Sequence, residues 1–148
     1  TRPGEVVLQT YNPEHFSVTA ARNQDFEMFY RQEIALRKAL HYPPYSRMIQ
    51  IRINGRDKGK TADHARWLGE QFQRLRRGQE DFSAVQMLGP IEAPLTRIDN
   101  QYRWQLLLKS SQAGALHRLV HAMLFGGHSG PARSAVQVSL DVDPVFLM

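Results

Sequence analysis

Cysteine is absent from this sequence of 148 residues. Its absence excludes disulfide bonds, thiolate nucleophiles and zinc sites that use cysteine ligands. A chain without cysteine fits a reducing compartment, and we expect this protein to lie in the cytoplasm. The sequence also lacks an apolar run of about 18 residues, so we expect no transmembrane helix and no membrane partner.

The N-terminal stretch TRPGEVVLQT has neither an initiator methionine nor the basic-then-apolar pattern of a secretory signal. We therefore expect the chain to be a fragment of a longer protein. Its length suits one domain with a short appendage.

Motifs for catalysis are missing as well. GGHSGP (126–131) has the glycine content of a phosphate loop, but it lacks the GK[ST] ending and precedes a strand pattern. His117 and His121 have a metal-binding spacing, but HRLVH lacks the glutamate of HExxH, which favours an exposed helix face. DVDP (141–144) holds two carboxylates that more readily form a turn and ion pairs. We expect no enzyme activity, metal or cofactor in this fragment.

Positive charge is the strongest compositional signal. The formal net charge is +5 and the isoelectric point is about 9.9. Residues 47–77 hold nine lysines and arginines against three acidic residues. Such a cluster favours a polyanionic partner, nucleic acid first. A solvated, inert helix face is the alternative interpretation of the same charges.

Hydrophobic periodicity predicts the secondary structure. A short apolar run predicts a strand at 4–12, and strand patterns follow at 47–54, 83–90, 101–110 and 135–144, with 91–98 extended but broken by Pro94. Helical spacing predicts helices at 25–40, 61–77 and 111–124. Asp25 or Asn23 can cap the first helix, and YPPY (42–45) must end it. Gly89-Pro90 is expected to end the strand at 83–90.

From Arg47 onward the order is β–α–β–β–α–β, the split βαβ or ferredoxin-like pattern. The expected fold is therefore α+β, with a four-stranded antiparallel sheet and two helices on one face. A strand and a helix precede this domain.

The stretch QYRWQLLLKS (101–110) raises the question of whether its aromatic residues stack bases. Tyr102 and Trp104 share a face with Leu106 and Leu108, and the other strands have a matching apolar face. NQYRWQLLL also lacks the signature of an RNA-recognition motif, which puts aromatics on its free face. The two rings are therefore expected in the core. The opposite face is expected to be polar, and its side chains Arg103, Gln105 and Lys109 would meet phosphate, sugar or protein.

Four stretches together resemble one family. They are PGEVVLQTYNPEH (3–15), FYRQEIALRKALHYPPYSR (29–47), LGPIEAPLTRIDNQYRWQLLLK (88–109) and LDVDP (140–144). Their order and spacing are similar to the C-terminal region of the primosomal protein N′ family, the PriA replication-restart helicases. The match is weaker in 55–85 and 110–135.

This resemblance implies a bacterial, nucleoid-associated parent protein that uses ATP to move 3′ to 5′ on DNA and restarts stalled forks by primosome assembly. It implies a ribosomal S10-like DNA-binding domain at 47–148, a linking helix and YPPY turn at 25–46, and the tail end of the second helicase lobe at 1–24. GEVVLQT would then be a lobe strand without its neighbours. ATP, magnesium and zinc would belong to domains outside this chain.

Candidate site residues follow from the resemblance and from the basic cluster. The resemblance implies DNA contact at Arg97, Tyr102 and Arg103, although Asp99-Asn100-Gln101 replaces the glycine or arginine of other members. The basic cluster and the polar sheet face add further candidates for DNA contact: Arg52, Arg66, Arg74, Arg77 and Lys109. Arg118 is the candidate for binding the acidic tail of single-stranded-DNA-binding protein.

Two functions stay open at this point. One is a non-catalytic DNA-binding accessory domain that binds forked and single-stranded DNA. The other is a protein-docking module for the helicase lobes, for the tail of single-stranded-DNA-binding protein and for other primosome proteins.

Overall fold

A computed structural model describes residues 4–127, 130–131 and 133–144. The chain divides into two compact units, Thr1–Leu40 and His41–Met148. YPPY thus belongs to the second unit, where the amide of Tyr45 donates to the carbonyl of Tyr42 over 2.9 Å and closes a turn.

The first unit contains two helices, α1 (Phe16–Asn23) and α2 (Phe26–Ala39). Asp25, not Asn23, caps α2, because its Oδ1 accepts from the amide of Met28 over 2.9 Å. The rings of Phe16 and Phe29 stack between the helices with 6.0 Å between their centroids. The helix expected at 25–40 is thereby confirmed, whereas α1 was not predicted.

The strand expected at 4–12 is wrong. This segment has no regular secondary structure, and its apolar side chains are exposed, with Val6 at 87%. A strand is stabilised by backbone hydrogen bonds to a neighbouring strand, and a short apolar run alone supplies none.

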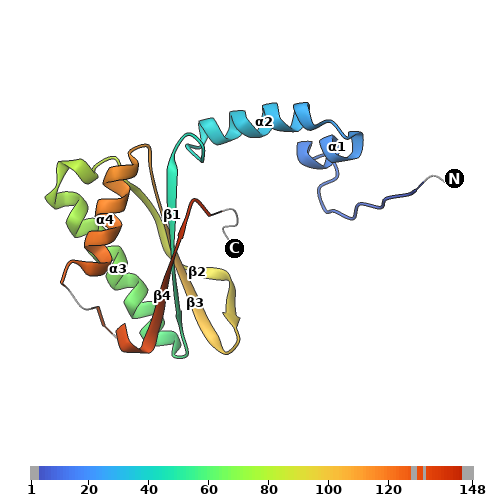
Figure 1. The fold of residues 1–148 in the computed structure, drawn as a ribbon. Coiled ribbons are helices and arrows are strands. Elements are labelled where there is room, and N and C mark those ends of the chain that lie inside the picture. The colour runs from blue at the N-terminus through green and yellow to red at the C-terminus, as the bar shows by residue number, and fades with distance from the viewer. Residues whose placement is uncertain (1–3, 128–129, 132, 145–148) are drawn as a thin grey trace. The chain divides into compact units, whose positions relative to one another are not determined.

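The second unit has the expected β–α–β–β–α–β order (Figure 1). Its elements are β1 (Arg47–Gly55), α3 (Lys58–Gly78), β2 (Gln86–Ile98), β3 (Gln101–Ser110), α4 (Ala113–Phe125) and β4 (Val136–Val142), with short 3-10 turns at Glu80–Phe82 and Arg133–Ala135. All three strand pairs are antiparallel, in the spatial order β2-β3-β1-β4. The predicted α+β fold is confirmed.

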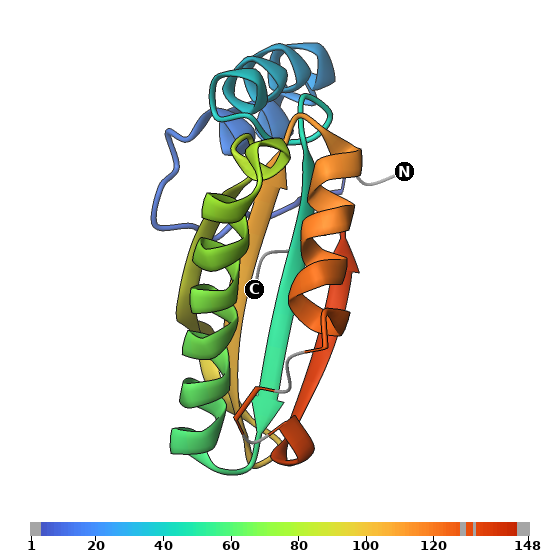
Figure 2. The same cartoon turned by 90° about the vertical axis from the view of Figure 1, so that its left-hand side faces the viewer.

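Helices α3 and α4 cover the same face of the sheet (Figure 2). The register pairs Ile51 with Leu106 and Ile49 with Leu108, and all four side chains are buried with those of α3 and α4. Trp104 pairs with Ile53 and packs against this core. The prediction that Trp104 is a core residue and not a base-stacking one is therefore confirmed in its placement.

Helix α3 starts at Lys58, three residues before the predicted 61–77. The side chain of Asp57 accepts from the amide of Lys60 over 2.9 Å and so fixes the earlier start. Gly78 is the last residue of the helix.

The strand expected to end at Gly89-Pro90 continues to Ile98, so that prediction is wrong. The chain absorbs the two residues as a bulge between Leu88 and Ile91, and a second irregularity lies between Glu92 and Arg97. Gly89 has φ +93°, and a Cβ built there would lie 2.8 Å from the carbonyl oxygen of Gln105. Glycine therefore lets the backbone turn close against β3 without breaking the pairing.

The bulge also changes which face some side chains occupy. Leu88 pairs with Leu107 and Ile91 pairs with Gln105, which puts all four on the face away from the helices. Leu88 is 50% exposed and Ile91 is 54% exposed. The face expected to be polar thus carries an apolar stripe, defined here as Leu88, Ile91 and Leu107.

Candidate nucleic-acid interface

Three of the predicted DNA-binding arginines lie along one groove. Arg66, Arg74 and Arg77 are exposed on α3, and they line a groove of about 660 Å³ between this helix and β2. They share one helix face because their spacings of eight and three residues are near multiples of the 3.6-residue turn. The other residues lining this α3 groove are Gly69, Glu70, Gln73, Met87, Gly89 and Pro90.

The opposite wall of the groove is the bulge of β2. A Cβ built on Gly69 would lie 3.0 Å from Cδ of Pro90, so the absence of a side chain lets α3 approach the bulge closely. Helix, bulge and arginines thereby form one surface, although they come from two separate segments of the sequence.

Two arginines of the α3 groove have weak partners on their own helix. Arg66 forms an ion pair with Asp63 at 2.7 Å, with both side chains more than half exposed. Arg74 donates to the side-chain oxygen of Gln71, a neutral group. Surface interactions of this kind contribute about 0–1 kcal/mol, so a phosphate can displace them.

A second cluster of predicted residues lies at the β2–β3 hairpin. The guanidinium of Arg97 lies 5.2 Å from the ring centroid of Tyr102 and also donates to the side-chain oxygen of Asn100. Arg103 donates to the carbonyl of Leu95 over 3.4 Å. The face of Tyr102 is therefore occupied by a cation, which leaves less of it for stacking on a base.

Tyr102 differs from Trp104 in its packing, since only Trp104 of the two packs against the core cluster. Tyr102 is half-buried at the start of β3 and does not belong to the core of the described chain, so its expected core placement is wrong. A shared strand face is therefore not sufficient to place a ring in the core.

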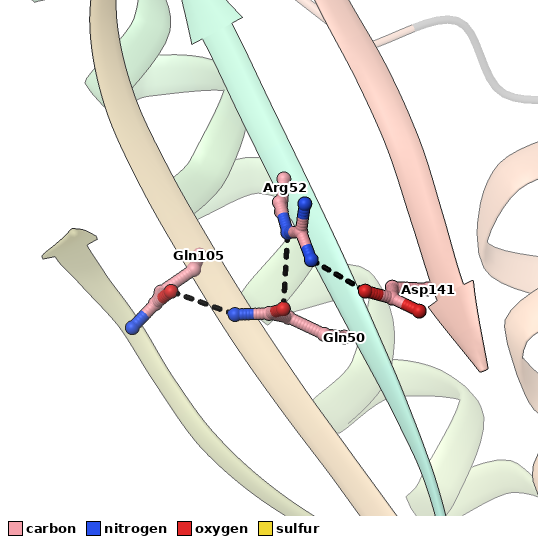
Figure 3. A network of polar contacts seen from close by, with 4 residues as sticks. All are labelled: Gln50, Arg52, Gln105 and Asp141. Atoms are coloured by element: carbon pink, nitrogen blue, oxygen red, sulfur yellow. Dashed lines mark hydrogen bonds and ion pairs between the residues drawn. The ribbon is translucent and has the colours of Figure 1, made fainter. Parts of the chain in front are cut away.

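Arg52 belongs to a polar network on the sheet face away from the helices (Figure 3). Its Nη2 lies 2.5 Å from Oδ2 of Asp141, and its Nε donates to Oε1 of Gln50 over 3.0 Å. Gln50 in turn donates to Gln105 over 2.8 Å, although Gln50 itself is only 1% exposed. The charge of Arg52 is thus matched within the protein, and Gln105 is engaged there too. Contact of Arg52 with DNA stays a prediction.

The remaining two candidates lie apart from the groove. Lys109 on β3 has its ammonium 5.3 Å from the ring centroid of Tyr42. Arg118 on α4 forms an exposed ion pair with Asp81 at 3.0 Å. The eight candidates for DNA contact and the tail-binding candidate Arg118 therefore do not form one site. The α3 groove collects three of them, and three others lie at the β2–β3 hairpin.

Most of the chain matches one known protein family. A family model for the "Primosomal protein N C-terminal domain" matches residues 38–145. The chain belongs to this family.

Relatives of this PriA C-terminal domain carry the name "Replication restart protein PriA". That of Bacillus subtilis is 30% identical over 99% of the chain and 18% of its own length. That of Synechocystis is 37% identical over 72% of the chain and 12% of its own length. That of Treponema pallidum is 34% identical over 98% of the chain and 21% of its own length. The chain thus spans about a fifth or less of these three relatives.

A solved structure of a de novo designed protein, Foldit4, aligns to 66% of the chain and 94% of its own, with a TM-score of 0.47 and 12% identity. The family assignment therefore depends on sequence and not on this likeness.

For a PriA C-terminal domain, the candidates for metal chemistry are weak. His117 and His121 are exposed on α4, and no cluster of three potential metal ligands occurs within 4–127, 130–131 and 133–144. GGHSGP (126–131) lies partly outside the described residues. No helix in the described part of the chain is long and apolar enough to cross a membrane.

Sequence reasoning missed several residues of the interface. Gln73 and Glu70 line the α3 groove, and Met87 with Pro90 forms its far wall. The helical spacing from Arg66 could have indicated Glu70 and Gln73. No pattern in the sequence indicates that the bulge of β2 lies beside them.

Proposed function

We propose that this PriA C-terminal domain is a non-catalytic DNA-binding accessory domain of a replication-restart helicase. The observation that carries the proposal is the alignment of Arg66, Arg74 and Arg77 along the α3 groove. Arginine side chains that replace condensed counterions on phosphates supply sequence-independent affinity for DNA.

The whole protein, in this proposal, is an ATP-dependent 3′–5′ DNA helicase of the bacterial cytoplasm that associates with the nucleoid. It binds forked and single-stranded DNA and assembles with other primosome proteins and with single-stranded-DNA-binding protein. ATP, magnesium and zinc are held by its other domains. The second helicase lobe ends within residues 1–24, and the DNA-binding domain covers 47–148.

The test is fluorescence anisotropy of a labelled forked DNA, titrated with the 148-residue chain at several salt concentrations. The logarithm of the association constant is expected to fall linearly with the logarithm of the salt concentration. Replacing Arg66, Arg74 and Arg77 by alanine together should reduce the magnitude of this slope by about 3, since each phosphate contact contributes about 0.9.

A matched control removes the same charge from the first unit. Arg22, Arg31 and Lys38 are exposed on α1 and α2, and their triple replacement by alanine should leave the slope nearly unchanged. No binding at tens of micromolar protein, binding without salt dependence, or equal loss in both triple variants would contradict the proposal.

A second candidate function is protein docking, which the apolar stripe Leu88, Ile91 and Leu107 favours. Half-exposed aliphatic side chains on one sheet face lower the cost of covering that face with a partner. Candidate partners are the helicase lobes and the acidic tail of single-stranded-DNA-binding protein. Titration with a peptide of that tail, followed by NMR, should shift stripe amides if the tail docks there. Unmoved stripe amides would exclude the tail as the occupant of the stripe.

A further inference from the structure

The α3 groove combines cationic side chains with a complete lack of stacking surface. Its lining consists of three arginines, one glutamate, one glutamine, methionine, proline and two glycines, with no aromatic side chain among these described residues. Proteins that hold single strands stack bases on aromatic side chains, and each stacked base contributes about 1–3 kcal/mol. The groove cannot supply this contribution to an unpaired base.

The spacing of the arginines suits a regular row of phosphates. Arg66 and Arg74 are eight residues apart, which is about 12 Å along a helix, and Arg77 follows about 4.5 Å further on. A duplex presents phosphates about every 3.4 Å along each strand, whatever its sequence, while its bases stay stacked inside. A helix face bearing arginines can therefore contact the backbone at several points without opening the base pairs.

The surroundings of these arginines support a phosphate ligand too. Asp63 pairs with Arg66 and Gln71 with Arg74, and both partners belong to α3 itself. A ligand from outside can therefore replace them without any rearrangement of the fold. Glu70, between the two arginines along the helix, is the one acidic side chain in the described lining of the groove. It opposes a polyanion and limits how tightly phosphates bind.

The geometry points to the backbone of double-stranded DNA, an arm of the fork and not its single-stranded part, as the ligand of the α3 groove. This inference rests on the proposed DNA-binding function and adds the class of DNA. The groove contacts phosphates and does not read the bases.

The experiment compares three labelled probes by anisotropy with the 148-residue chain: a 20-base single strand, the 20-base-pair duplex of the same sequence, and a fork with duplex and single-stranded arms. The duplex and the fork should bind with similar affinity, and the single strand about threefold or more weakly, in keeping with its lower charge density. The triple alanine variant of Arg66, Arg74 and Arg77 should lose this preference.

A gain-of-affinity variant tests the groove without the risk of unfolding the protein. Glu70→Gln should tighten duplex binding about two- to threefold at low salt, since it removes a repulsive charge from within a Debye length of the phosphates. Glu14→Gln makes the same change of charge at an exposed position of the first unit, and should leave duplex affinity unchanged.

The outcomes separate this inference from the proposed function. Equal or tighter binding of the single strand, or a duplex preference that survives the triple variant, overturns the inference but leaves DNA binding in place. An equal gain in Glu14→Gln and Glu70→Gln also overturns it. Failure of all three probes to bind at low salt overturns the inference and the proposed function together.

Discussion

Arg52 and Asp141 meet diagonally across two neighbouring strands, with 2.5 Å between Nη2 of the arginine and Oδ2 of the aspartate. The residue directly opposite Asp141 is Gln50, whose side-chain oxygen accepts from Nε of Arg52 over 3.0 Å. The arginine therefore joins β4 to the centre of β1 on the face away from the helices.

Replacing Arg52 by alanine should mainly destabilise the fold. The ion pair is partly exposed and contributes modestly, but Gln50 is buried and its side-chain oxygen would lose a hydrogen-bond donor. We expect a loss of about 2 kcal/mol in the free energy of unfolding, measured by urea denaturation at neutral pH.

Asp141→Asn is the matched variant for this network, because it removes one charge and keeps the shape of the side chain. It should cost less than Arg52→Ala, about 0.5–1 kcal/mol. If Arg52→Ala left stability unchanged and instead reduced the salt slope of DNA binding by about 1, then Arg52 would be a phosphate contact after all.

Trp104 should matter for stability and not for DNA binding. Its ring packs against the core, and its buried Nε1 has no hydrogen-bond partner in the described structure. Trp104→Phe keeps much of the packing and removes this unsatisfied donor, so we expect a change within about 1 kcal/mol. Trp104→Ala should cost about 3 kcal/mol because it leaves a cavity.

Urea denaturation followed by circular dichroism measures both variants at Trp104, and anisotropy measures their DNA binding. Trp104→Phe should bind forked DNA as the parent chain does. A large loss of DNA affinity in a Trp104→Phe variant that folds normally would instead indicate that Trp104 stacks on a base.

The second unit was predictable because its strands alternate cleanly between faces. Ile49, Ile51 and Ile53 of β1 pair in the register with Leu108, Leu106 and Trp104 of β3, and the amphipathic helices supply the facing layer. The segment 4–12 shows where sequence reasoning fails, since its short apolar run Val6–Leu8 occurs without a paired strand. An apolar run indicates that a strand could be buried and does not supply its neighbour.

The β2 strand shows a second limit of periodicity. Counting in twos from Met87 places Ile91 on the helix-facing side, but the bulge at Gly89-Pro90 adds a residue and moves Ile91 to the other side. The place of Ile91 in the apolar stripe, and the wall of the α3 groove that Pro90 forms, both depend on this bulge. The arginines of the α3 groove were singled out from charge, but the surface that they share was not predictable.

Gly89→Ala should strongly destabilise the second unit. The positive φ disfavours any side chain, and the new Cβ would clash with the carbonyl oxygen of Gln105 at 2.8 Å. We expect a loss of about 2–3 kcal/mol in the free energy of unfolding, measured by urea denaturation. Gly78→Ala is the control, because a Cβ there meets no atom within 4 Å and alanine favours the helix.

Gly78→Ala should therefore be neutral or stabilising by up to about 1 kcal/mol. If Gly89→Ala were tolerated as well as Gly78→Ala, then the bulge would not require glycine. The conformational freedom of Gly89 would then not be the reason that β2 continues to Ile98.

The ion pair between Arg118 and Asp81 offers a test of the tail-binding prediction in both directions. Both side chains are more than half exposed, so the pair contributes little to stability and holds Arg118 only loosely. If Arg118 binds the acidic tail of single-stranded-DNA-binding protein, then Asp81 competes with that tail for the guanidinium. Asp81→Asn should therefore tighten binding of a tail peptide about two- to threefold at low salt, and Arg118→Ala should weaken it by a similar factor. Both effects should shrink as salt is raised, and NMR titration of the 148-residue chain measures them. Weaker binding in Asp81→Asn, or unchanged binding in Arg118→Ala, would remove Arg118 from the tail site.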